Sequence, residues 1–342
     1  MREISIKKNE AGQRMDKFLA KYLNKAPKSF FYKMMRKKNI TLNGKKAVGN
    51  EQLKQGDVIK LFLAEETIEN FIDYSQFSKK KASSVKKQTA GKKVQLDILY
   101  EDEAAVFINK PVGMLSQKAS PTDTSLVEYF IDYLLENGKI TEEELHTFHP
   151  SVCNRLDRNT SGIVAAGKTL QALQGLSEMF RDRTLKKYYL CLVKGQVKEN
   201  QRIHGYLVKN EKTNKVTVSQ KKPAEQTKDG KEASAIDTEY KVLARNRETT
   251  LLEVHLITGK THQIRAHLAS IGHPIAGDYK YGNRSFNDAL KKEYGLRSQL
   301  LHAYRLEFPE NCEGDIKQLS GKIIKAPVPA LFERICKAQG VM

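Results

Sequence analysis

The sequence lacks the features of a membrane-spanning or secreted protein. It has only four cysteines in 342 residues, Cys153, Cys191, Cys312 and Cys336. No two of them form a Cys-x-x-Cys pair, so we expect free thiols and no bound metal. No stretch is long and apolar enough to span a bilayer, and the N-terminus lacks the pattern of a signal peptide. We therefore expect a cytoplasmic protein that does not associate with membranes.

Acidic residues are also few compared with basic ones. Asp and Glu number 40 against 59 Lys and Arg, which gives a net charge of +19 and an isoelectric point near 9.5. This balance favours a polyanionic partner: nucleic acid is the first candidate and an anionic membrane surface is the alternative. The length is sufficient for two domains with at least one sizeable core.

One segment in the middle of the chain carries the strongest functional signal. Residues 154–162 read Asn-Arg-Leu-Asp-Arg-Asn-Thr-Ser-Gly and precede an apolar run at 163–166, which predicts a loop that places Asp157 at the mouth of a buried strand. Arg155 and Arg158 would lower the pKa of the carboxyl group and keep it ionised, as nucleophilic or base chemistry requires. A turn or capping role for Asp157 is the structural alternative.

The segment Arg-Leu-Asp-x-x-Thr-Ser-Gly resembles the signature of the RluA-type pseudouridine synthases. Three other parts resemble further motifs of that family in the same order: residues 100–114, with Lys-Pro-x-Gly near the end; Lys-x-Tyr at 187–189; and Gly-Lys-x-His-Gln-Ile-Arg-x-His at 259–267. Leu300-Leu301-His302-Ala303 resembles the last motif. The resemblance covers most of the chain from residue 94 to residue 334.

The family resemblance implies a role for each matching residue. Asp157 is expected to be the catalytic carboxylate, Tyr189 to stack on the target uracil, and Arg265 to pair with Asp157. Ordinary packing within a strand is the alternative for Tyr189. The remaining expected substrate-binding residues are Arg155, Lys187, His262 and Leu301. The reaction requires no cofactor or metal, and Asp157 would either attack the anomeric carbon or remove a ribose proton.

The first 63 residues resemble the small RNA-binding module named after the fourth small-subunit ribosomal protein. The sequence predicts a helix over 15–23, a second helix that begins at a capping Ser29, a hairpin at Asn43-Gly44 and a strand over 58–63. Phe30 stands where the family usually has an arginine. We expect RNA contacts from exposed basic residues, and a merely solvated surface is the alternative. These residues are Lys33, Arg36, Lys37 and Lys45.

We divide the chain into an RNA-binding domain at 1–63, a flexible Lys-rich linker at 64–93 and a catalytic domain at 94–342. From Lys79 to Lys93 there are seven lysines and no acid, a composition typical of disorder. Such a linker would also contact RNA phosphates. The catalytic domain is predicted as α+β, with a mixed, largely antiparallel sheet and a central cleft that holds Asp157.

These observations predict an RNA pseudouridine synthase that acts as a monomer. Large-subunit ribosomal RNA is the favoured substrate, because the N-terminal module is typical of the RluC and RluD branch, and tRNA is the alternative. A noncatalytic RNA-binding or ribosome-assembly factor is the main competing class. A glycosidase-like hydrolase is a further rival, but the sequence shows no second acid at a recognisable motif.

Overall fold

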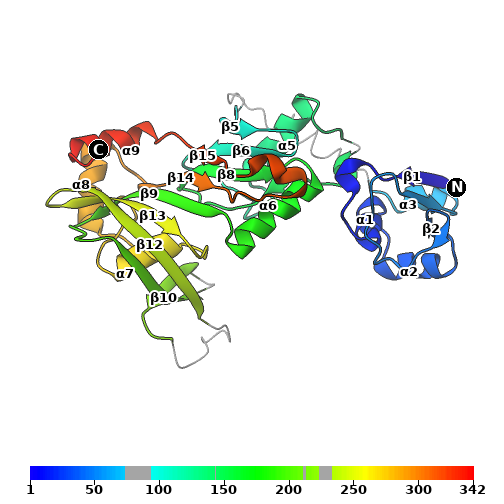
Figure 1. Cartoon of the computed structure of the whole chain (residues 1–342), viewed down its shortest axis with the longest axis horizontal. Helices are drawn as coiled ribbons and strands as arrows, with labels where there is room; N and C mark the ends of the chain where they lie inside the picture. The colour runs from blue at the N-terminus through cyan, green and yellow to red at the C-terminus, as the bar shows by residue number, and fades with distance from the viewer. Residues whose placement is uncertain (74–93, 143, 211–212, 223–232) are drawn as a thin grey trace.

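The computed structural model describes residues 1–73, 94–142, 144–210, 213–222 and 233–342. These residues form an N-terminal body, drawn in blue in Figure 1, and a larger body that begins after residue 93. The lysine run predicted between Lys79 and Lys93 lies outside the described residues.

The N-terminal body combines a small antiparallel sheet with helices whose apolar sides form its core. The sheet has the strand order β1-β4-β2-β3, with β1 at Arg2–Ser5, β2 at Ile40–Leu42, β3 at Lys45–Lys46 and β4 at Val58–Leu61. A short turn of helix, η1 (Lys8–Glu10), follows β1, and α1 (Met15–Tyr22) and α2 (Lys28–Arg36) come next. Their apolar residues recur three and four positions apart, which places them on one side of each helix. The buried ones are Met15, Phe18, Leu19, Phe31 and Met35.

The hairpin expected at Asn43-Gly44 is confirmed. Strands β2 and β3 pair antiparallel on either side of these two residues. Their φ angles are 49° and 73°, and a two-residue hairpin loop of type I′ requires positive φ at both positions. The side chain of Asn43 also bonds Asp57, which fixes the loop against the start of β4.

Two local expectations for this body were wrong. Helix α2 begins at Lys28 after Pro27 and has no side-chain cap, so Ser29 does not cap it. A helix, α3 (Glu65–Asn70), occupies part of the range predicted as linker, and its Ile68 joins the buried core together with Ile72. Phe30 packs on Phe71 after α3, with ring centroids 4.7 Å apart, which gives the departure from the family pattern a packing role.

The larger body is built on one mixed sheet. Among the described residues eleven strands belong to it, and nine follow the order β11-β10-β12-β13-β9-β14-β8-β6-β5, with β7 on β8 and β15 on β14. The pair β8 and β14 is parallel, and the other pairs are antiparallel. The predicted α+β class with a largely antiparallel sheet is therefore confirmed (Figure 1). The strands are β5 (Ile98–Glu101), β6 (Ala105–Lys110), β7 (Ser151–Val152), β8 (Ser161–Gly167), β9 (Lys186–Lys194), β10 (Gln201–Asn210), β11 (Lys215–Ser219), β12 (Ser234–Arg245), β13 (Thr249–Leu256), β14 (Leu301–Glu307) and β15 (Ile323–Lys325).

Helices cover both faces of the sheet around β6 and β8. Alternate residues of a strand point to opposite faces, so a strand covered on both sides is apolar throughout. Val106 and Val164 share a core with α5 (Leu126–Glu136). Phe107 and Ala165 share a second core with α6 (Leu170–Asp182) and η3 (Gly314–Leu319). The buried β8 positions the segment that precedes it, which contains Asp157.

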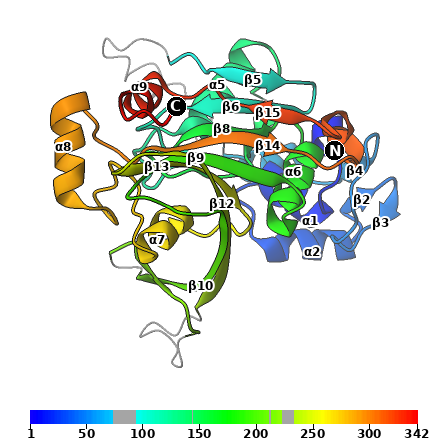
Figure 2. The same ribbon diagram turned by 60° about the vertical axis from the view of Figure 1, so that its left-hand side comes forward.

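Three further helices cover the other half of the sheet. Helix α7 (Gln263–Ser270) lies inside the bend formed by β9, β12 and β10 (Figure 2), with Ile264 and Leu268 in the core. Helices α8 (Arg284–Tyr294) and α9 (Ala330–Ala338) bury residues against the opposite side of β9 and β13. A short turn of helix, η2 (Glu144–His146), precedes β7. No helix among the described residues has the length and apolar content needed to cross a membrane.

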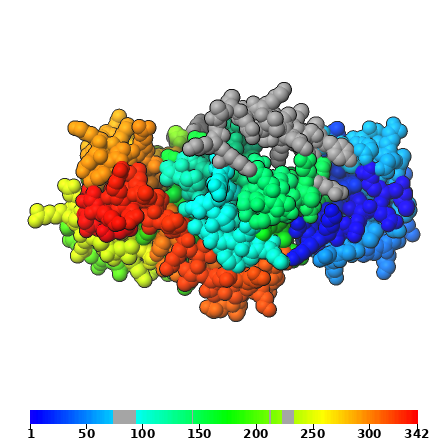
Figure 3. Space-filling view, turned by 90° about the horizontal axis from the view of Figure 1, so that it is seen from above, coloured from blue at the N-terminus to red at the C-terminus, as the bar shows by residue number. Residues whose placement is uncertain are grey.

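The two bodies meet through a buried polar contact. The hydroxyl of Thr147 donates to Oε1 of Glu10 at 2.6 Å, and the backbone N–H of Lys7 donates to Oε2 at 2.9 Å. Figure 3 shows the N-terminal body at one end of the elongated molecule and the C-terminal helix toward the other. The contact joins η1 of the N-terminal body to the segment that precedes β7.

Candidate active site

Backbone-directed hydrogen bonds hold the loop that carries Asp157. Asn154 accepts from the N–H of Ala165 and donates to the carbonyl of Ile163, so its side chain ties the loop to β8. The hydroxyl of Ser116 bonds both the N–H and the carbonyl of Leu156. Hydrogen bonds therefore fix the backbone on both sides of Asp157. Its side chain is 27% exposed at the mouth of the buried strand, as the sequence predicts.

Gly162 allows the neighbouring strand to approach this loop. Its φ is 112°, and a Cβ atom there would lie 2.1 Å from the carbonyl oxygen of Ala303 on β14. Real Cβ atoms do not tolerate such a distance, because it is far inside van der Waals contact. The glycine of the Asp-x-x-Thr-Ser-Gly segment is therefore required by the parallel pairing of β8 with β14.

Lys110 links the Asp157 loop to the segment that follows β6. Its buried ammonium group donates to the carbonyls of Pro111, Met114 and Arg158, at 3.0, 2.9 and 3.1 Å. Burial lowers its pKa to about 8, against the opposing effect of the Asp157 charge. Lys110 belongs to a matched motif, but the sequence pattern predicts no role for its ammonium group.

Arg265 lies between two carboxylates. Its Nη1 donates to Oδ2 of Asp157 at 2.8 Å, and its Nε and Nη2 donate to the two oxygens of Asp278 at 2.7 and 2.9 Å. Burial alone would lower the pKa of Arg265, but the bonds to Asp278 and the charges of both acids raise it above its ordinary value. The expected contact with Asp157 is present, while the bidentate bond goes to Asp278, a residue that the sequence motifs do not predict for the site.

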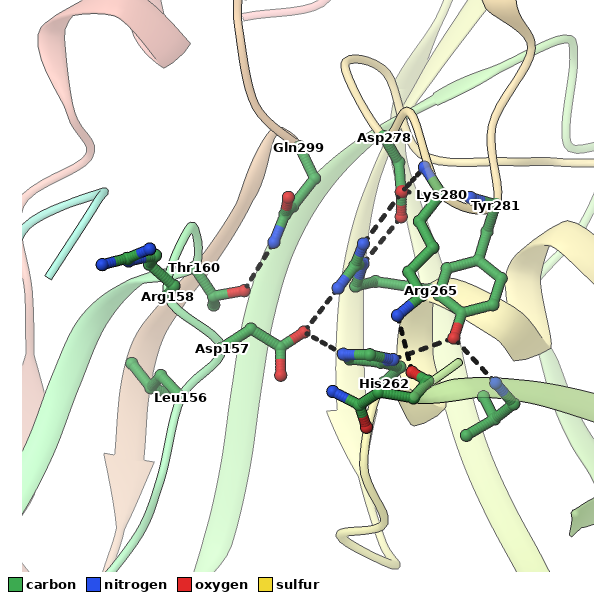
Figure 4. Close-up of polar contacts among 12 residues, drawn as sticks. Leu156, Asp157, Arg158, Thr160, His262, Arg265, Asp278, Lys280, Tyr281 and Gln299 are labelled. Carbon is green, nitrogen blue, oxygen red and sulfur yellow. Dashed lines mark hydrogen bonds and ion pairs between the residues drawn. The ribbon is translucent and has the colours of Figure 1, made fainter. Parts of the chain in front are cut away.

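His262 is the second nitrogen-bearing side chain beside Asp157. It lies immediately before α7 in the left-handed region, with φ of 54°, and its Nε2 is 3.9 Å from Oδ2 of Asp157. Its Nδ1 bonds the hydroxyl of Tyr281 at 2.8 Å. Burial lowers the pKa of His262, an effect that Asp157 partly offsets. Figure 4 shows this arrangement, with the side chain of Arg158 turned away from Asp157.

A single cavity of about 570 Å³ brings together the residues expected to form the site. Tyr189 projects into it from the middle of β9, whereas its neighbour Tyr188 stacks on His255, 4.9 Å away. Burial, followed by the charge of Asp157, raises the pKa of Tyr189 above its ordinary value. All seven residues predicted for this domain line the cavity: Arg155, Asp157, Lys187, Tyr189, His262, Arg265 and Leu301.

Comparison with known proteins decides the family. Residues 104–270 match the family described as RNA pseudouridylate synthase. A ribosomal large subunit pseudouridine synthase C of Vibrio parahaemolyticus is 32% identical over 97% of this chain and 94% of its own length. The chain belongs to the RNA pseudouridylate synthase family. It is accordingly an isomerase that converts uridine in RNA to pseudouridine, and the expected family is confirmed.

Other relatives agree with this assignment of the synthase. The protein of the same name from Salmonella typhi is 30% identical over 94% of this chain and 93% of its own length. The solved structure of human RNA pseudouridylate synthase domain containing 4 superposes with a TM-score of 0.54 at 24% identity, covering 79% of this chain and 99% of that one. This likeness supports the fold of the catalytic body.

The basic residues predicted in the N-terminal body of the synthase lie outside the cavity. Lys33, Arg36 and Lys37 are exposed on α2 or directly after it, and Lys45 is exposed on β3. No cluster of three or more potential metal-binding side chains occurs in the part of the chain that the structure describes.

Proposed function

We propose that this synthase modifies uridines of large-subunit ribosomal RNA, with Asp157 as its reactive carboxylate. The ribosomal substrate is supported by relatives named for the large subunit, which align with nearly the whole chain, the N-terminal body included. The role of Asp157 is supported by its ion pair with Arg265 at the wall of a cavity that also contains Tyr189.

The reaction breaks the bond between N1 of uracil and C1′ of ribose and forms a bond from C5 to C1′. The proton leaves C5 and N1 gains one, so the reaction needs no oxidant and no other substrate. Asp157 can act in two ways: it attacks C1′, as the nucleophile of a retaining glycosidase does, or it removes a ribose proton. Arg265 supports both routes, because its charge-assisted bond holds the carboxylate in one orientation.

Tyr189 and Leu301 offer surfaces for the detached base. A base must leave its stack before it can turn, and enzymes hold such extruded bases against aromatic and apolar side chains. The raised pKa of Tyr189 keeps its phenol neutral, so we assign it stacking rather than action as a phenolate. Arg155, exposed beside the cavity, would enter the space that the base vacates in the RNA.

Phosphate contacts would come from both bodies of the protein. Lys187 is only 7% exposed and lies in the cavity. A buried ammonium group is stabilised by a nearby anion, and an RNA phosphate would supply one. The exposed basic residues Lys33, Arg36, Lys37 and Lys45 would hold RNA outside the cavity. His262 would contact the substrate from the Asp157 side.

We further propose that the enzyme works as a monomer in the cytoplasm. The division into an RNA-binding domain, a linker and a catalytic domain is also a proposal. The packing of α3 supports placing the first boundary after residue 73 instead of after residue 63.

The deciding experiment maps pseudouridines in ribosomal RNA by carbodiimide modification at single-nucleotide resolution. The three strains compared carry a gene deletion, the deletion with the wild-type gene, or the deletion with Asp157→Ala. We expect specific large-subunit sites to vanish on deletion and to return only with the wild-type protein. If these sites persist in all strains, tRNA becomes the substrate to map. If Asp157→Ala restores them, the carboxylate is not required.

A further inference from the structure

Tyr281 contacts both partners of Asp157. Its hydroxyl bonds Nδ1 of His262 at 2.8 Å, and the guanidinium carbon of Arg265 lies 5.2 Å from its ring centroid. Its backbone N–H donates to Asp278, the bidentate partner of Arg265, at 3.1 Å. Tyr281 therefore touches His262, Arg265 and Asp278 together (Figure 4), and the family resemblance gave it no role.

The second hydrogen bond of this hydroxyl favours one direction for the first. The backbone N–H of Val216, on β11, points at the Tyr281 oxygen at 3.0 Å. A backbone N–H can only donate, so the phenol oxygen accepts that bond and its own proton is available for another acceptor. The nitrogen at 2.8 Å, Nδ1 of His262, is placed to receive it.

The direction of this bond determines the tautomer of His262. A neutral imidazole has one N–H group, and if Nδ1 accepts a proton then the N–H must be at Nε2. That nitrogen faces Oδ2 of Asp157 at 3.9 Å. Were Nδ1 protonated instead, two N–H groups would point at the phenol oxygen, and the carboxylate would face the lone pair of Nε2.

We propose that Tyr281 is a positioning residue that holds His262 in the tautomer with its proton on Nε2, directed at Asp157. Oδ2 of Asp157 then faces two donors, Arg265 and His262, which leaves Oδ1 of Asp157 for the substrate. This inference rests on the proposed role of Asp157. It adds a residue that does not itself touch the reacting atoms.

The groups around His262 favour the neutral ring that this proposal requires. Burial opposes protonation most strongly, and the charges of Arg265 and Lys280 act in the same direction. Asp157 and Asp278 act in the opposite direction and do not outweigh the others.

The loop that carries His262 has an unusual backbone conformation that its neighbours hold in place. The φ of 54° at His262 is unusual for a residue with a side chain, and such conformations persist only where the surroundings hold them. Gln263 provides that support: its Oε1 accepts from the N–H of Lys260 and the hydroxyl of Thr258, and its Nε2 donates to the carbonyl of Asp237.

The test compares Tyr281→Phe with Tyr279→Phe. Tyr279→Phe also removes a tyrosine hydroxyl from the same turn, but the hydroxyl of Tyr279 donates to Asp288 on the surface, at 3.0 Å. Nitrogen NMR of labelled imidazoles reports the tautomer and the pKa, and the signal of His262 is assigned by its absence in His262→Gln. Single-turnover rates are measured as tritium released from C5 of uridine in RNA.

In the wild type and in Tyr279→Phe we expect His262 protonated on Nε2. In Tyr281→Phe we expect a mixture of tautomers and a higher pKa for His262. We also expect a single-turnover rate about tenfold lower with unchanged RNA affinity, the effect of one lost hydrogen bond to a partner of Asp157. Wild-type His262 protonated on Nδ1 would overturn the proposal. An unchanged rate in Tyr281→Phe would overturn it as well, whatever the tautomer.

A second variant covers the case in which Tyr281→Phe does not fold. His262→Asn keeps an acceptor near the Tyr281 hydroxyl and suits the left-handed backbone, but it has no group at the position of Nε2. Its rate should be at least about tenfold below that of the wild type, and a wild-type rate would refute the proposal. The NMR result is independent of activity, so an inactive wild type with the expected tautomer would count against the proposed function alone.

Discussion

Asp278 should be as important to this site as residues within the matched motifs. Its side chain is completely buried and makes two bonds to Arg265. It also accepts the backbone N–H groups of Lys280 and Tyr281, at 2.9 and 3.1 Å. Asp278→Asn keeps the shape of the side chain but removes its charge and turns one acceptor into a donor that faces the guanidinium. We therefore expect this variant to disturb both stability and catalysis.

The structure allows the size of the effect to be worked out. Removing one partner of a buried ion pair costs about 3 to 5 kcal/mol, because the other charge stays buried. Arg265 retains its single bond to Asp157, so we expect the lower end of that range. A small domain has about 5 to 15 kcal/mol of stability, so the variant should fold. A guanidinium displaced by about 1 Å would slow the reaction by about a hundredfold.

The assay is a double-mutant cycle followed by urea unfolding and tritium release. Arg265→Met, Asp278→Asn and the double variant are compared with the wild type, and Asp288→Asn is the matched surface control. Arg265→Met leaves the buried charge of Asp278 without its guanidinium partner, and Asp278→Asn leaves Arg265 with one carboxylate partner instead of two. The double variant should therefore lose less stability than the two single losses combined. The reasoning would be refuted if Asp278→Asn lost under about 1 kcal/mol and kept its rate, as expected of the surface control.

Three further predictions concern other parts of the chain. Burial, followed by the charge of Arg183, lowers the pKa of Lys187 from 10.5 to about 8, so its charge destabilises the fold below pH 8 and less as pH rises toward 10.5. At pH 7 the free energy of unfolding of Lys187→Met should therefore exceed that of the wild type by about 3 kcal/mol, and this gain should fade as pH rises above 8. The RNA affinity of the wild type should fall as pH rises through 8, whereas that of Lys187→Met should not. Gly162→Ala should lower stability by at least about 3 kcal/mol through clash and strain. Gly138 has a φ of 63° and no atom within 4 Å of the position that a Cβ would take, so Gly138→Ala should lose only the stability that backbone strain costs. Equal losses of stability in the two variants would argue against the clash at Gly162. Alanine at the four basic positions of the N-terminal body should reduce the slope of log affinity against log salt by up to about 3, whereas Lys291→Ala with Lys292→Ala on α8 should leave it unchanged. The four positions are Lys33, Arg36, Lys37 and Lys45.

The sequence predicts most of the cavity because each of its motifs is local. Asp157, Tyr189 and Arg265 each lie in a short segment with its own pattern, and the structure places all three around one cavity. Asp278 could not be found in this way. It is 13 residues from Arg265, and no periodicity links an acid in a turn to an arginine inside a helix. Only the fold brings the two side chains together.

The folded extent of the N-terminal body was misjudged for a related reason. Helix α3 is six residues long and begins with two acids, so it is too short to show an amphipathic repeat. Its apolar residues find their partners on distant segments, as Phe30 does with Phe71. Composition alone predicts linker at such a segment, because the contacts that order it are tertiary.

The segment from Thr258 to His267 contains polar side chains that serve the loop structure as well as side chains that face Asp157. Gln263 holds the loop backbone, and His267 bonds the hydroxyl of Thr238 at 3.0 Å, away from Asp157. Only Arg265 and His262 are directed at the carboxylate.

The bond from Arg265 to Asp157 joins the two halves of the sheet. Asp157 belongs to the loop before β8, Arg265 to α7 beyond β9, and Tyr189 to β9 between them. Any slip of β14 between β8 and β9 would therefore separate the acid from its partner, which gives Gly162 a functional importance although it touches no substrate. The Asp157 loop and the N-terminus of α7 face each other across the cavity, and we propose that the target base enters between them.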